Sequence, residues 1–399
     1  MKRWFFALVG LLAMLLAGLI YAWGVLSAPI AAEFSTWSGT GFSFTFTLCM
    51  IFFCLGSILA GVLARRMPAQ RNLLIAGALF LLGFALTGRI RALWQLYLGY
   101  GVCAGCASGL AYGAIMAVVP RHFPDRPGLI SGILLMGFGA SSLVIGSVFT
   151  SMAASVGWRQ ALLLFGIVIG AVLVIAGFVL RAPEHTAQKG KAALTERDRT
   201  PGQMAATSTF WLLIVWSILL AGLGLAVIGQ SRGLLQSVRP EISPAQLSLF
   251  VGLISVCNGL GRLFFGAVYD RTGWRRTILA VCAASLLGAV LLAASLRGSL
   301  ALMVAAFAII GLGYGGAPTF NAAAAKQFFG ETYFPINFPI INLNLLVSSF
   351  VPTLVSGIAA ARGGYGAAAL FLVAMGAVSV PIALLIRQPK ENIHPDAAD

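Results

Sequence analysis

Acidic residues are scarce in this chain. Of its 399 residues only 11 are Asp or Glu, against 26 Lys or Arg, and charged residues of both signs make up 9%. Soluble domains carry about 25% charged residues, which keep their surfaces hydrated. The scarcity excludes an ordinary soluble domain. The hydrophobic content of 59% and the mean hydropathy of +0.95 indicate a protein that is integral to a membrane.

Side chains that catalyse reactions or bind metals are also few. The three His residues and all 11 acids fall in predicted loops, helix ends or tails. The predicted membrane spans therefore offer no cluster of His, Asp, Glu or base-activated Ser of the kind that a metal centre or a hydrolase needs. No phosphate-binding loop of the GxxxxGK[ST] type occurs either. We expect the protein not to be an enzyme and to use neither a metal nor a cofactor.

The six cysteines all fall within predicted spans. Cys103 and Cys106 form a CAGC sequence that superficially resembles a redox or metal-binding pair. Glycines recur at every fourth position from Gly101 to Gly113 in the same stretch. Such a stripe of small residues favours close helix packing in a membrane, so we interpret the two thiols as part of a packed helix.

Long apolar runs are abundant, and each has roughly the 20 residues that a helix needs to cross a bilayer. Alternating hydrophobicity, which is typical of a membrane β-barrel, is missing. The twelve predicted spans are 4–28, 44–64, 72–88, 93–119, 128–151, 160–180, 209–231, 245–267, 277–296, 300–325, 336–360 and 366–386. The first span begins like a signal peptide, but its apolar part is too long for one, and we expect it to remain as a helix.

Basic residues are distributed unevenly between the predicted loops. With both termini assigned to the cytoplasm, 18 of the 26 Lys and Arg residues fall on the inner side, 7 on the outer side, and Arg262 within a span. This asymmetry is typical of multi-pass proteins and accounts for the net charge of +15 without a nucleic-acid partner. The predicted location is a bacterial-type cytoplasmic (inner) membrane.

The longest polar segment divides the predicted spans into two sets of six. We predict an N-terminal six-helix bundle over 1–181, a cytoplasmic linker over 182–208, a C-terminal six-helix bundle over 209–387 and a cytoplasmic tail over 388–399. Similar short sequences occur at matching span ends in the two halves. This recurrence indicates an internal repeat of parallel six-helix units. The predicted fold class is an all-α membrane protein of twelve helices in two six-helix repeats.

A basic turn follows the second span of each half, GVLARRMPAQR at 61–71 and GAVYDRTGWRR at 266–276. Together with the twelve-span layout, the second turn resembles that of the major facilitator superfamily, whose members are membrane carriers. In the first turn Arg65 stands where the family pattern has an acid, and Pro68 where it has glycine. Short basic inner loops also arise from topology alone.

The acid and arginines of such a turn can pair across a cytoplasmic helix junction and hold one conformation of a carrier. The predicted gating residues are Asp270, Arg271, Arg275 and Arg276.

Four further stretches resemble the oxalate/formate antiporter family and its monocarboxylate-transporter relatives. They are IYAWGVLSAP at 20–29, GLAYG at 109–113, FPDRPGLISGILLMGFG at 123–139 and NGLGRLFFGAVYDRTG at 258–273. The stretches occur in the order and in the helices of that family. The resemblance implies a carrier of small organic anions.

Arg262 lies eight residues before Asp270, the acid at the end of its predicted span. This spacing places Arg262 about 12 Å along the helix axis, near the middle of the membrane. A charged side chain there costs at least about 2.5 kcal/mol. The arginine can extend to the cytoplasmic interface or cap carbonyl groups of a neighbouring helix, or it can face the transport pathway and bind an anion.

Two observations favour anion binding. Aligning Gly266 with Gly61 makes Ser57 the repeat partner of Arg262, so no symmetric architecture demands an arginine. The spans also offer no clear acid to neutralise it, and the planar guanidinium suits a carboxylate. A loaded site, once neutralised, should reorient more easily than an empty one, which predicts exchange of one anion for another. Proton coupling through a side chain is disfavoured, although the substrate itself can carry a proton.

Other polar and aromatic residues complete the predicted site, because Tyr and Asn can hydrogen-bond a carboxylate at lower cost than a charge. Ordinary packing or an interfacial position is an equally open interpretation of each one alone. The candidates are Tyr21, Trp23, Tyr112, Asn258, Tyr314, Asn321, Asn342 and Asn344.

The oxalate exchanger of the resembled family has a lysine midway along helix 11. Here 337–352 contains no cation, and Asn342 and Asn344 occupy that neighbourhood. One buried positive charge suits a monoanion better than a dianion. Pro335, Pro339 and Pro352 either kink this helix or mark its ends.

The sequence therefore predicts a secondary carrier that exchanges small monocarboxylates, bound through Arg262, across a lipid bilayer. We expect it to be a monomer. A major facilitator exporter of drugs or other organic compounds keeps the same fold, but a cationic drug would need a buried acid. A transporter-like membrane sensor or receptor is an alternative of another class, and the 27 residues of the predicted linker leave little room for an added domain.

Overall fold

The protein is described by a computed structural model, which covers residues 2–37, 39–64, 66–181 and 197–389. These residues form helices and connecting turns, without a strand among them. Twelve helical segments in this part are long and apolar enough to cross a membrane: Arg3–Glu33, Phe44–Leu63, Ala69–Thr87, Leu93–His122, Pro127–Val156, Trp158–Val179, Ser208–Val238, Gly252–Thr272, Trp274–Ser295, Leu300–Phe329, Phe334–Ala361 and Gly366–Leu385. The prediction of an all-α membrane protein with twelve spans is confirmed, with ends that differ by a few residues.

The chain folds into two compact units. The described part of unit 1 lies within Met1–Pro124, Ile133–Leu194 and Thr332–Ile340. The described part of unit 2 lies within Asp125–Gly132, Thr195–Glu331 and Ile341–Asp399. Each unit thus includes a short stretch from the other half of the chain. The predicted domain boundaries stay a prediction, since 182–196 of the predicted linker and 390–399 of the predicted tail lie outside the described residues.

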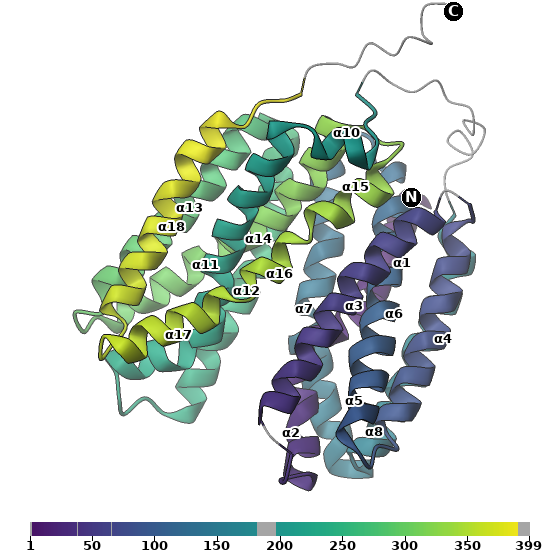
Figure 1. Ribbon diagram of the computed structural model, residues 1–399, viewed down its shortest axis with the longest axis horizontal. Coiled ribbons are helices and arrows are strands. Elements are labelled where there is room, and N and C mark those ends of the chain that lie inside the picture. Colours follow the sequence, from purple (N-terminus) through teal and green to yellow (C-terminus); the bar gives the residue numbers. More distant parts are fainter. Residues whose placement is uncertain (1, 38, 65, 182–196, 390–399) are drawn as a thin grey trace, which may run out of the picture. The chain divides into compact units, whose positions relative to one another are not determined.

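Unit 1 contains the first six spans, labelled in Figure 1. Its helices are α1 (Lys2–Ala17), η1 (Gly18–Ala22), α2 (Trp23–Glu33), α3 (Gly39–Leu63), α4 (Ala69–Thr87), α5 (Leu93–Leu96), η2 (Tyr97–Ala104), α6 (Gly105–Val118), η3 (Val119–His122), α7 (Pro127–Val156) and α8 (Trp158–Val179). The first turn of α7 belongs to unit 2, and most of α15 (Phe334–Ile341) belongs to unit 1.

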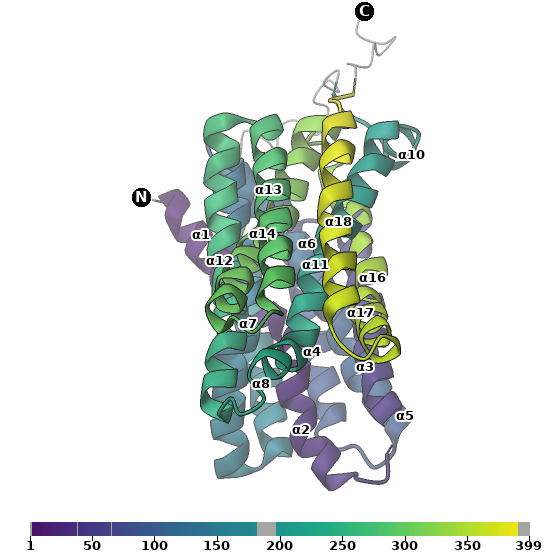
Figure 2. The same ribbon diagram turned by 90° about the vertical axis from the view of Figure 1, so that its left-hand side faces the viewer.

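Unit 2 contains the remaining helices. They are α10 (Pro201–Ala205), α11 (Ser208–Val238), α12 (Pro244–Thr272), α13 (Trp274–Ser295), α14 (Leu300–Phe329), α16 (Asn344–Ser348), α17 (Val351–Ala361) and α18 (Gly366–Leu385). In Figure 2, α18 runs beside α13, and the two helices are in contact. Apolar side chains such as Leu292, Phe307 and Met375 are buried together between these helices and form the core of the unit.

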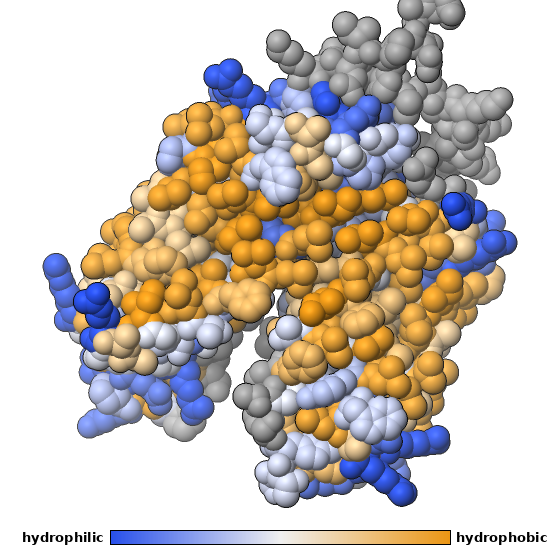
Figure 3. Space-filling model, viewed as in Figure 1, coloured by the Kyte–Doolittle hydropathy of each residue, from blue (hydrophilic) through white to orange (hydrophobic). Residues whose placement is uncertain are grey.

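The helices bury their backbone polar groups in their own hydrogen bonds, which a chain surrounded by lipid requires. Large apolar side chains, among them Phe178, Trp211 and Leu370, point outward from the spans and are more than half exposed. On the face of each unit shown in Figure 3, hydrophobic residues cover the middle and hydrophilic residues gather at the ends. This distribution is the one that a bilayer stabilises.

Close helix packing repeats in the two units. A Cβ atom added to Gly109 of α6 would overlap the carbonyl oxygen of Phe53 in α3, and one added to Gly315 of α14 would overlap that of Asn258 in α12. The two pairs occupy corresponding positions of the predicted repeat. The interpretation of the Gly101 to Gly113 stripe as a packing surface is confirmed, and all six cysteines are free thiols within the packed helices.

The eleventh span is interrupted twice. It consists of α15, α16 and α17, which are separated by turns at 342–343 and 349–350. Pro339 lies inside α15, whereas Pro352 lies in the first turn of α17, where its missing N–H costs nothing. Pro339 thus lies within one segment of this span, and Pro352 begins another.

Candidate substrate-binding site

Arg262 lies in α12, within the membrane span Gly252–Thr272, and its side chain is only 6% exposed. Among the described residues, Arg262 and Asp198 are the only buried charged side chains. The Nε of Arg262 donates a hydrogen bond to Oδ1 of Asn258, one turn earlier, at 3.3 Å. The two candidate residues are therefore hydrogen-bonded to each other, and their role in substrate binding stays a prediction.

The backbone around Arg262 is fixed by two close helix contacts. A Cβ atom on Gly315 of α14 would lie 2.9 Å from the amide nitrogen of Arg262. One on Gly132, at the end of the α7 segment that belongs to unit 2, would overlap the carbonyl oxygen of Arg262. The two glycines allow the backbones of α14 and α7 to pack directly against α12 at Arg262. The side chain of Arg262 therefore extends from a closely packed part of the helix.

Tyr314 joins this group from α14. The Tyr314 side chain is 8% exposed, and the next residue, Gly315, lies against the backbone of Asn258 and Arg262. The ring lies against Gly224 of α11, where an added Cβ would overlap the Cγ atom of the ring. Arg262, Asn258 and Tyr314 are thus buried on the packed helices α12 and α14, and contact of the Tyr314 phenol with a substrate stays a prediction.

Asn321 lies two turns beyond Tyr314 on α14 and is used within the bundle. Its Nδ2 donates to Oγ of Ser217 in α11 at 2.9 Å. Ser217 also donates to the carbonyl oxygen of Leu213 at 2.7 Å. Asn321 therefore connects α11 with α14, and any role of this residue in binding stays a prediction.

Asn342 and Asn344 lie where the eleventh span is interrupted, and both are buried. Nδ2 of Asn344 donates to the carbonyl oxygen of Ile341 at 2.6 Å, which satisfies a carbonyl group at the end of α15. The Asn344 carbonyl oxygen accepts from Oγ of Ser348 at 2.8 Å. The geometry gives Asn344 a local role in ending one helix and beginning the next.

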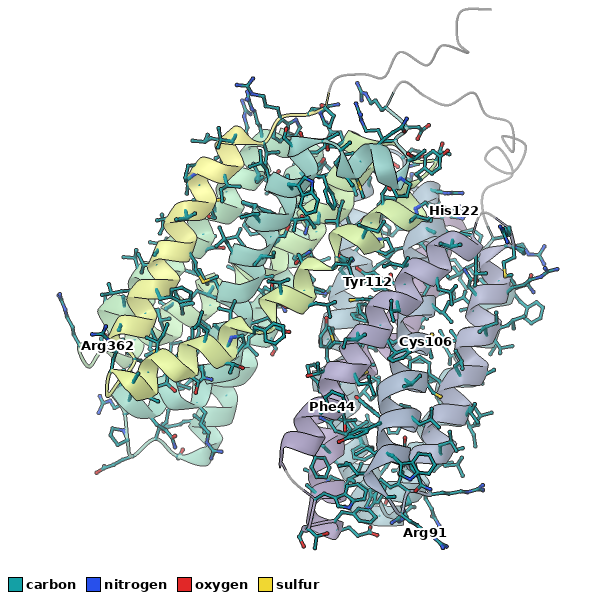
Figure 4. All side chains as sticks on the ribbon, in the orientation of Figure 1. Phe44, Arg91, Cys106, Tyr112, His122 and Arg362 are labelled. Carbon is teal, nitrogen blue, oxygen red and sulfur yellow. The ribbon has the colours of Figure 1, made fainter. Side chains whose placement is uncertain are left out.

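Tyr21, Trp23 and Tyr112 lie in unit 1. Tyr112 of α6 is 4% exposed and packs edge-on against Phe138 of α7, with ring centroids 5.1 Å apart. Tyr21 of η1 contacts the same Phe138 ring at 5.4 Å. Figure 4 labels Tyr112 among the helices of unit 1. Tyr21 and Tyr112 thus belong to one aromatic cluster.

Trp23 is anchored separately. Its indole Nε1 donates to the carbonyl oxygen of Phe42 at 3.2 Å, and its ring lies 4.4 Å from that of Tyr100. The only hydrogen-bond donor of the side chain is occupied by this contact. The geometry favours a packing role for Trp23, and substrate contact stays a prediction.

Asp270, the acid of the predicted gating turn, binds the first turn of α7. Its Oδ1 accepts from the amide nitrogen of Gly128 and its Oδ2 from that of Leu129, both at 2.8 Å. A carboxylate at a helix N-terminus satisfies free N–H groups and interacts favourably with the helix dipole. Gly266 makes room for this contact, because a Cβ there would overlap the carbonyl oxygen of Gly128.

The arginines of this turn point into solvent. Arg271, Arg275 and Arg276 are exposed, and the guanidinium of Arg275 lies over the ring of Trp274 at 5.6 Å. Asp270 therefore latches onto backbone amides of α7, a contact that the sequence did not specify. Gating by these four residues stays a prediction.

Sequence reasoning missed the glycines and the serine that shape the site. Gly132 and Gly315 let the backbones of α7 and α14 pack closely against α12. Ser217 accepts a hydrogen bond from the side chain of Asn321. Gly132 lies in a stretch that already resembles the antiporter family, so the motif contained that signal. Ser217 stands alone in an apolar run, and no local pattern marks it.

Comparison with known proteins agrees with this architecture. The model of the Major Facilitator Superfamily matches residues 5–329, most of the chain. The chain belongs to this superfamily. Members of this family are membrane transporters and not enzymes. The chain is accordingly a multi-pass membrane transporter and not an enzyme.

Relatives in the superfamily span most of the chain. It is 26% identical over 348 residues to the uncharacterized MFS-type transporter YhjX of Escherichia coli strain K12, covering 87% of this chain and 86% of YhjX. It is 27% identical over 348 residues to the oxalate:formate antiporter of Oxalobacter formigenes, covering 84% and 80%. Over a shorter stretch of 112 residues, 28% of this chain and 25% of the relative, it is 35% identical to monocarboxylate transporter 11 of Mus musculus.

Solved structures share the fold. The transporter FucP in its outward conformation superposes with a TM-score of 0.72 at 16% identity, covering 96% of this chain and 99% of FucP. The proton:xylose symporter XylE superposes with a TM-score of 0.73 at 14% identity, covering 97% of each chain. These likenesses concern the fold alone.

Proposed function

We propose that this transporter exchanges small organic anions, in the first place monocarboxylates, and that Arg262 binds the carboxylate group. The observation that carries the proposal is a guanidinium that is 6% exposed inside the span Gly252–Thr272. Keeping a charge there costs free energy, and a bound anion offsets that cost. Two parallel N–H···O bonds from the guanidinium match the two oxygens of a carboxylate.

The neighbours of Arg262 support the same substrate class. Asn258 accepts from its Nε, which holds the guanidinium plane, and the Tyr314 hydroxyl can donate to a carboxylate oxygen. Arg262 is the only buried cation among the described residues, which favours a single negative charge on the substrate. The buried Asn342 and Asn344, where the oxalate exchanger of the resembled family has a lysine, favour a monoanion in the same way.

Several carboxylates of the protein are engaged elsewhere. Glu33 pairs with Arg159, Glu331 with Lys326, and Asp270 with the amides of α7. A substrate carboxylate is then the negative charge that changes when the carrier loads and unloads. Because a loaded site is neutral and an unloaded site carries a buried charge, we infer that the loaded form reorients faster, so that transport proceeds as exchange.

The named relatives support the proposal without determining the substrate. The oxalate:formate antiporter and the monocarboxylate transporters are named for small carboxylates. We place the protein in the inner membrane of a bacterium with both termini in the cytoplasm, as the distribution of basic residues predicts, and we expect it to act as a monomer.

Transport into liposomes tests this function. Purified protein is reconstituted and offered radiolabelled formate, lactate, pyruvate, oxalate and an amide of one of these acids. We expect uptake of a monocarboxylate that depends on unlabelled monocarboxylate inside the liposomes, with little uptake of the amide. Net uptake into empty liposomes at the same rate as exchange would contradict the exchange mechanism, and preference for the amide would contradict the substrate class.

A further inference from the structure

A cavity of about 600 Å³ lies within unit 1, and Arg262 is not among the residues that line it. Its walls come from the turn between α3 and α4, from the ends of η3 and α8, and from the start of α15. The volume falls within the range of about 300 to 1,000 Å³ that is usual for ligand sites. We call it the basic cavity, because its charged lining residues are Arg121 and Arg181 and none of its lining residues is acidic.

Three features of the basic cavity attract an anion. The guanidinium groups of Arg121 and Arg181 are the first two. The third is the N-terminus of α4, whose first residues Ala69 and Gln70 line the cavity. That first turn contains no acid and receives no side-chain cap from Pro68, so its backbone N–H groups and the positive end of the helix dipole favour a negative ligand.

The position of the cavity indicates where the anion comes from. Its lining residues flank the ends of spans: Ala69 begins one span, Arg181 follows another that ends at Val179, and Pro335 lies at the start of a third. They therefore lie at the depth of lipid headgroups. Figure 4 shows His122, next to Arg121, at one end of unit 1 and Arg91 at the other, so the cavity belongs to one membrane face.

The residues that follow Arg121 in the chain, His122 and Phe123, make contacts that are typical of a membrane interface. Nε2 of His122 lies 2.9 Å from the carbonyl oxygen of Arg181, and Phe6 of α1 stacks on the His122 ring at 4.4 Å. Trp4, which is 44% exposed, packs edge-on against Phe123. Aromatic and basic side chains of this kind gather at headgroup level, where basic pockets between spans recognise anionic headgroups.

We propose that the basic cavity binds a phosphate anion, carried by the headgroup of an anionic phospholipid or free in solution. Arg121 and Arg181 hold the phosphate oxygens, and the N-terminus of α4 contributes backbone N–H groups. The bound anion connects the ends of η3, α4 and α8 with the first residues of α15.

Lipid titration followed by native mass spectrometry tests the proposal on the purified full chain. The probes are phosphatidylglycerol, phosphatidylcholine and inorganic phosphate. We expect phosphatidylglycerol to bind more tightly than the zwitterionic phosphatidylcholine. Arg181→Gln and Arg121→Gln should each weaken this binding about fivefold, and the double variant more than tenfold, since a basic residue at an anionic surface is worth about 1 kcal/mol.

Controls separate binding from folding. Arg362→Gln removes an exposed cation from unit 2 and should bind phosphatidylglycerol like the parent, while Arg181→Lys should retain most of the binding. Arg181 is exposed, so Arg181→Gln should keep the thermal unfolding temperature of the lipid-free protein. This single variant keeps the test valid if Arg121→Gln fails to fold.

Each outcome decides the question. Binding of phosphatidylglycerol that depends on the two arginines and resists added phosphate supports a lipid ligand. Displacement of the lipid by phosphate, or phosphate binding that depends on the same arginines, supports a soluble phosphate ligand. If the double variant binds all three probes as the parent does, the proposal is overturned.

Discussion

Helices α3 and α12 occupy the same place in the two repeats, yet they carry different side chains along the same stripe. In α3, every fourth position reads Phe53, Ser57, Gly61, and in α12 the corresponding series reads Asn258, Arg262, Gly266. Residues four apart lie on one face of a helix, so each series is a continuous surface.

The backbone contacts of the two stripes are alike. Gly109 lies against the Phe53 carbonyl oxygen as Gly315 lies against that of Asn258. Gly61 and Gly266 each lie against the backbone of a helix start, at Pro335 and Gly128 respectively. The comparison teaches that the two repeats share a helix packing that depends on glycine, while the side chains between the glycines differ.

The turns after the two helices show the same divergence. Gly273, between α12 and α13, has φ +80°, a conformation that glycine adopts at low cost. Its counterpart in the first repeat is Pro68, with φ −63°, and α3 ends at Leu63, about one turn before the position that matches the end of α12 at Thr272. The second repeat thus has a sharp turn and an acid bound to α7, and the first has a longer turn beside the basic cavity.

Replacing Arg262 should have the largest effect on exchange, because it removes the buried cation that α12 has and α3 lacks. Arg262→Ala should lower exchange of the preferred carboxylate at least 100-fold, since a bidentate pair with a carboxylate is worth about 3 kcal/mol or more. Arg262→Lys keeps the charge but loses the planar fork, so it should retain more activity than Ala and less than the parent. Initial rates in liposomes measure both, and full activity of either variant would refute the role of Arg262.

Gly266→Ala should come next. The added Cβ would overlap the Gly128 carbonyl oxygen, and overpacking of this kind costs about 1 to 3 kcal/mol. Gly252→Ala in the same helix is the matched control, because a Cβ there meets nothing within 4 Å. Thermal unfolding in detergent should show a loss of stability for Gly266→Ala and no loss for Gly252→Ala. An equal response of the two variants would argue against the close contact.

Asp270→Asn should have an intermediate effect. The amide keeps one acceptor, but it loses the charge and turns an NH₂ group towards an N–H of α7, which costs about 2 kcal/mol. We expect a lower unfolding temperature and a changed exchange rate with an unchanged KM. Glu241→Gln, at an exposed acid, should change neither quantity. A normal exchange rate and unfolding temperature in Asp270→Asn would mean that the contact with α7 contributes little.

Asn258→Ala should have a smaller effect that is specific to binding. Asn258 orients the Arg262 guanidinium through one hydrogen bond, which is worth about 1 kcal/mol. We expect KM for the carboxylate to rise about fivefold, in line with that energy, while the rate at saturation stays the same. Uptake measured over a range of substrate concentrations separates the two. A lower saturated rate with unchanged KM would contradict an orienting role.

Ser57→Ala should have the smallest effect, although Ser57 corresponds to Arg262 in the repeat. The Ser57 hydroxyl is buried and makes no hydrogen bond in the structure. Removing a buried polar group without a partner is neutral or slightly stabilising. The unfolding temperature should stay the same or rise, and exchange should proceed at the rate of the parent. A severe loss of exchange would show that the first repeat also binds substrate through this position.

Much of the fold was predictable because the bilayer imposes simple rules on a sequence. Apolar length gave all twelve spans, and the glycine stripe from Gly101 gave a helix-packing surface. Pro352 directly follows the break at 349–350, but the break at 342–343 was not predictable from the prolines, because Pro339 lies inside α15. The break at 342–343 depends on hydrogen bonds such as that of Asn344, which only the folded chain determines.

The candidate site was predictable only in part. Arg262 was identifiable because a cation is rare in an apolar run. Its proximity to Asn258 was predictable because residues four apart in a helix are one turn apart. The contact of Asp270 with Gly128 and Leu129 joins residues more than 140 positions apart, and no local pattern encodes such a pairing. For the same reason the sequence did not distinguish the packed Trp23 from a residue that binds substrate.

Equilibrium binding to purified protein tests the central claim most directly. The parent and Arg262→Gln are titrated in detergent with the radiolabelled carboxylate that the liposome screen selects, and with its uncharged amide as competitor. The account predicts that the parent binds the carboxylate, that the amide competes poorly, and that Arg262→Gln keeps its unfolding temperature but loses carboxylate binding. Equal affinity of the parent and Arg262→Gln for the carboxylate would contradict the account.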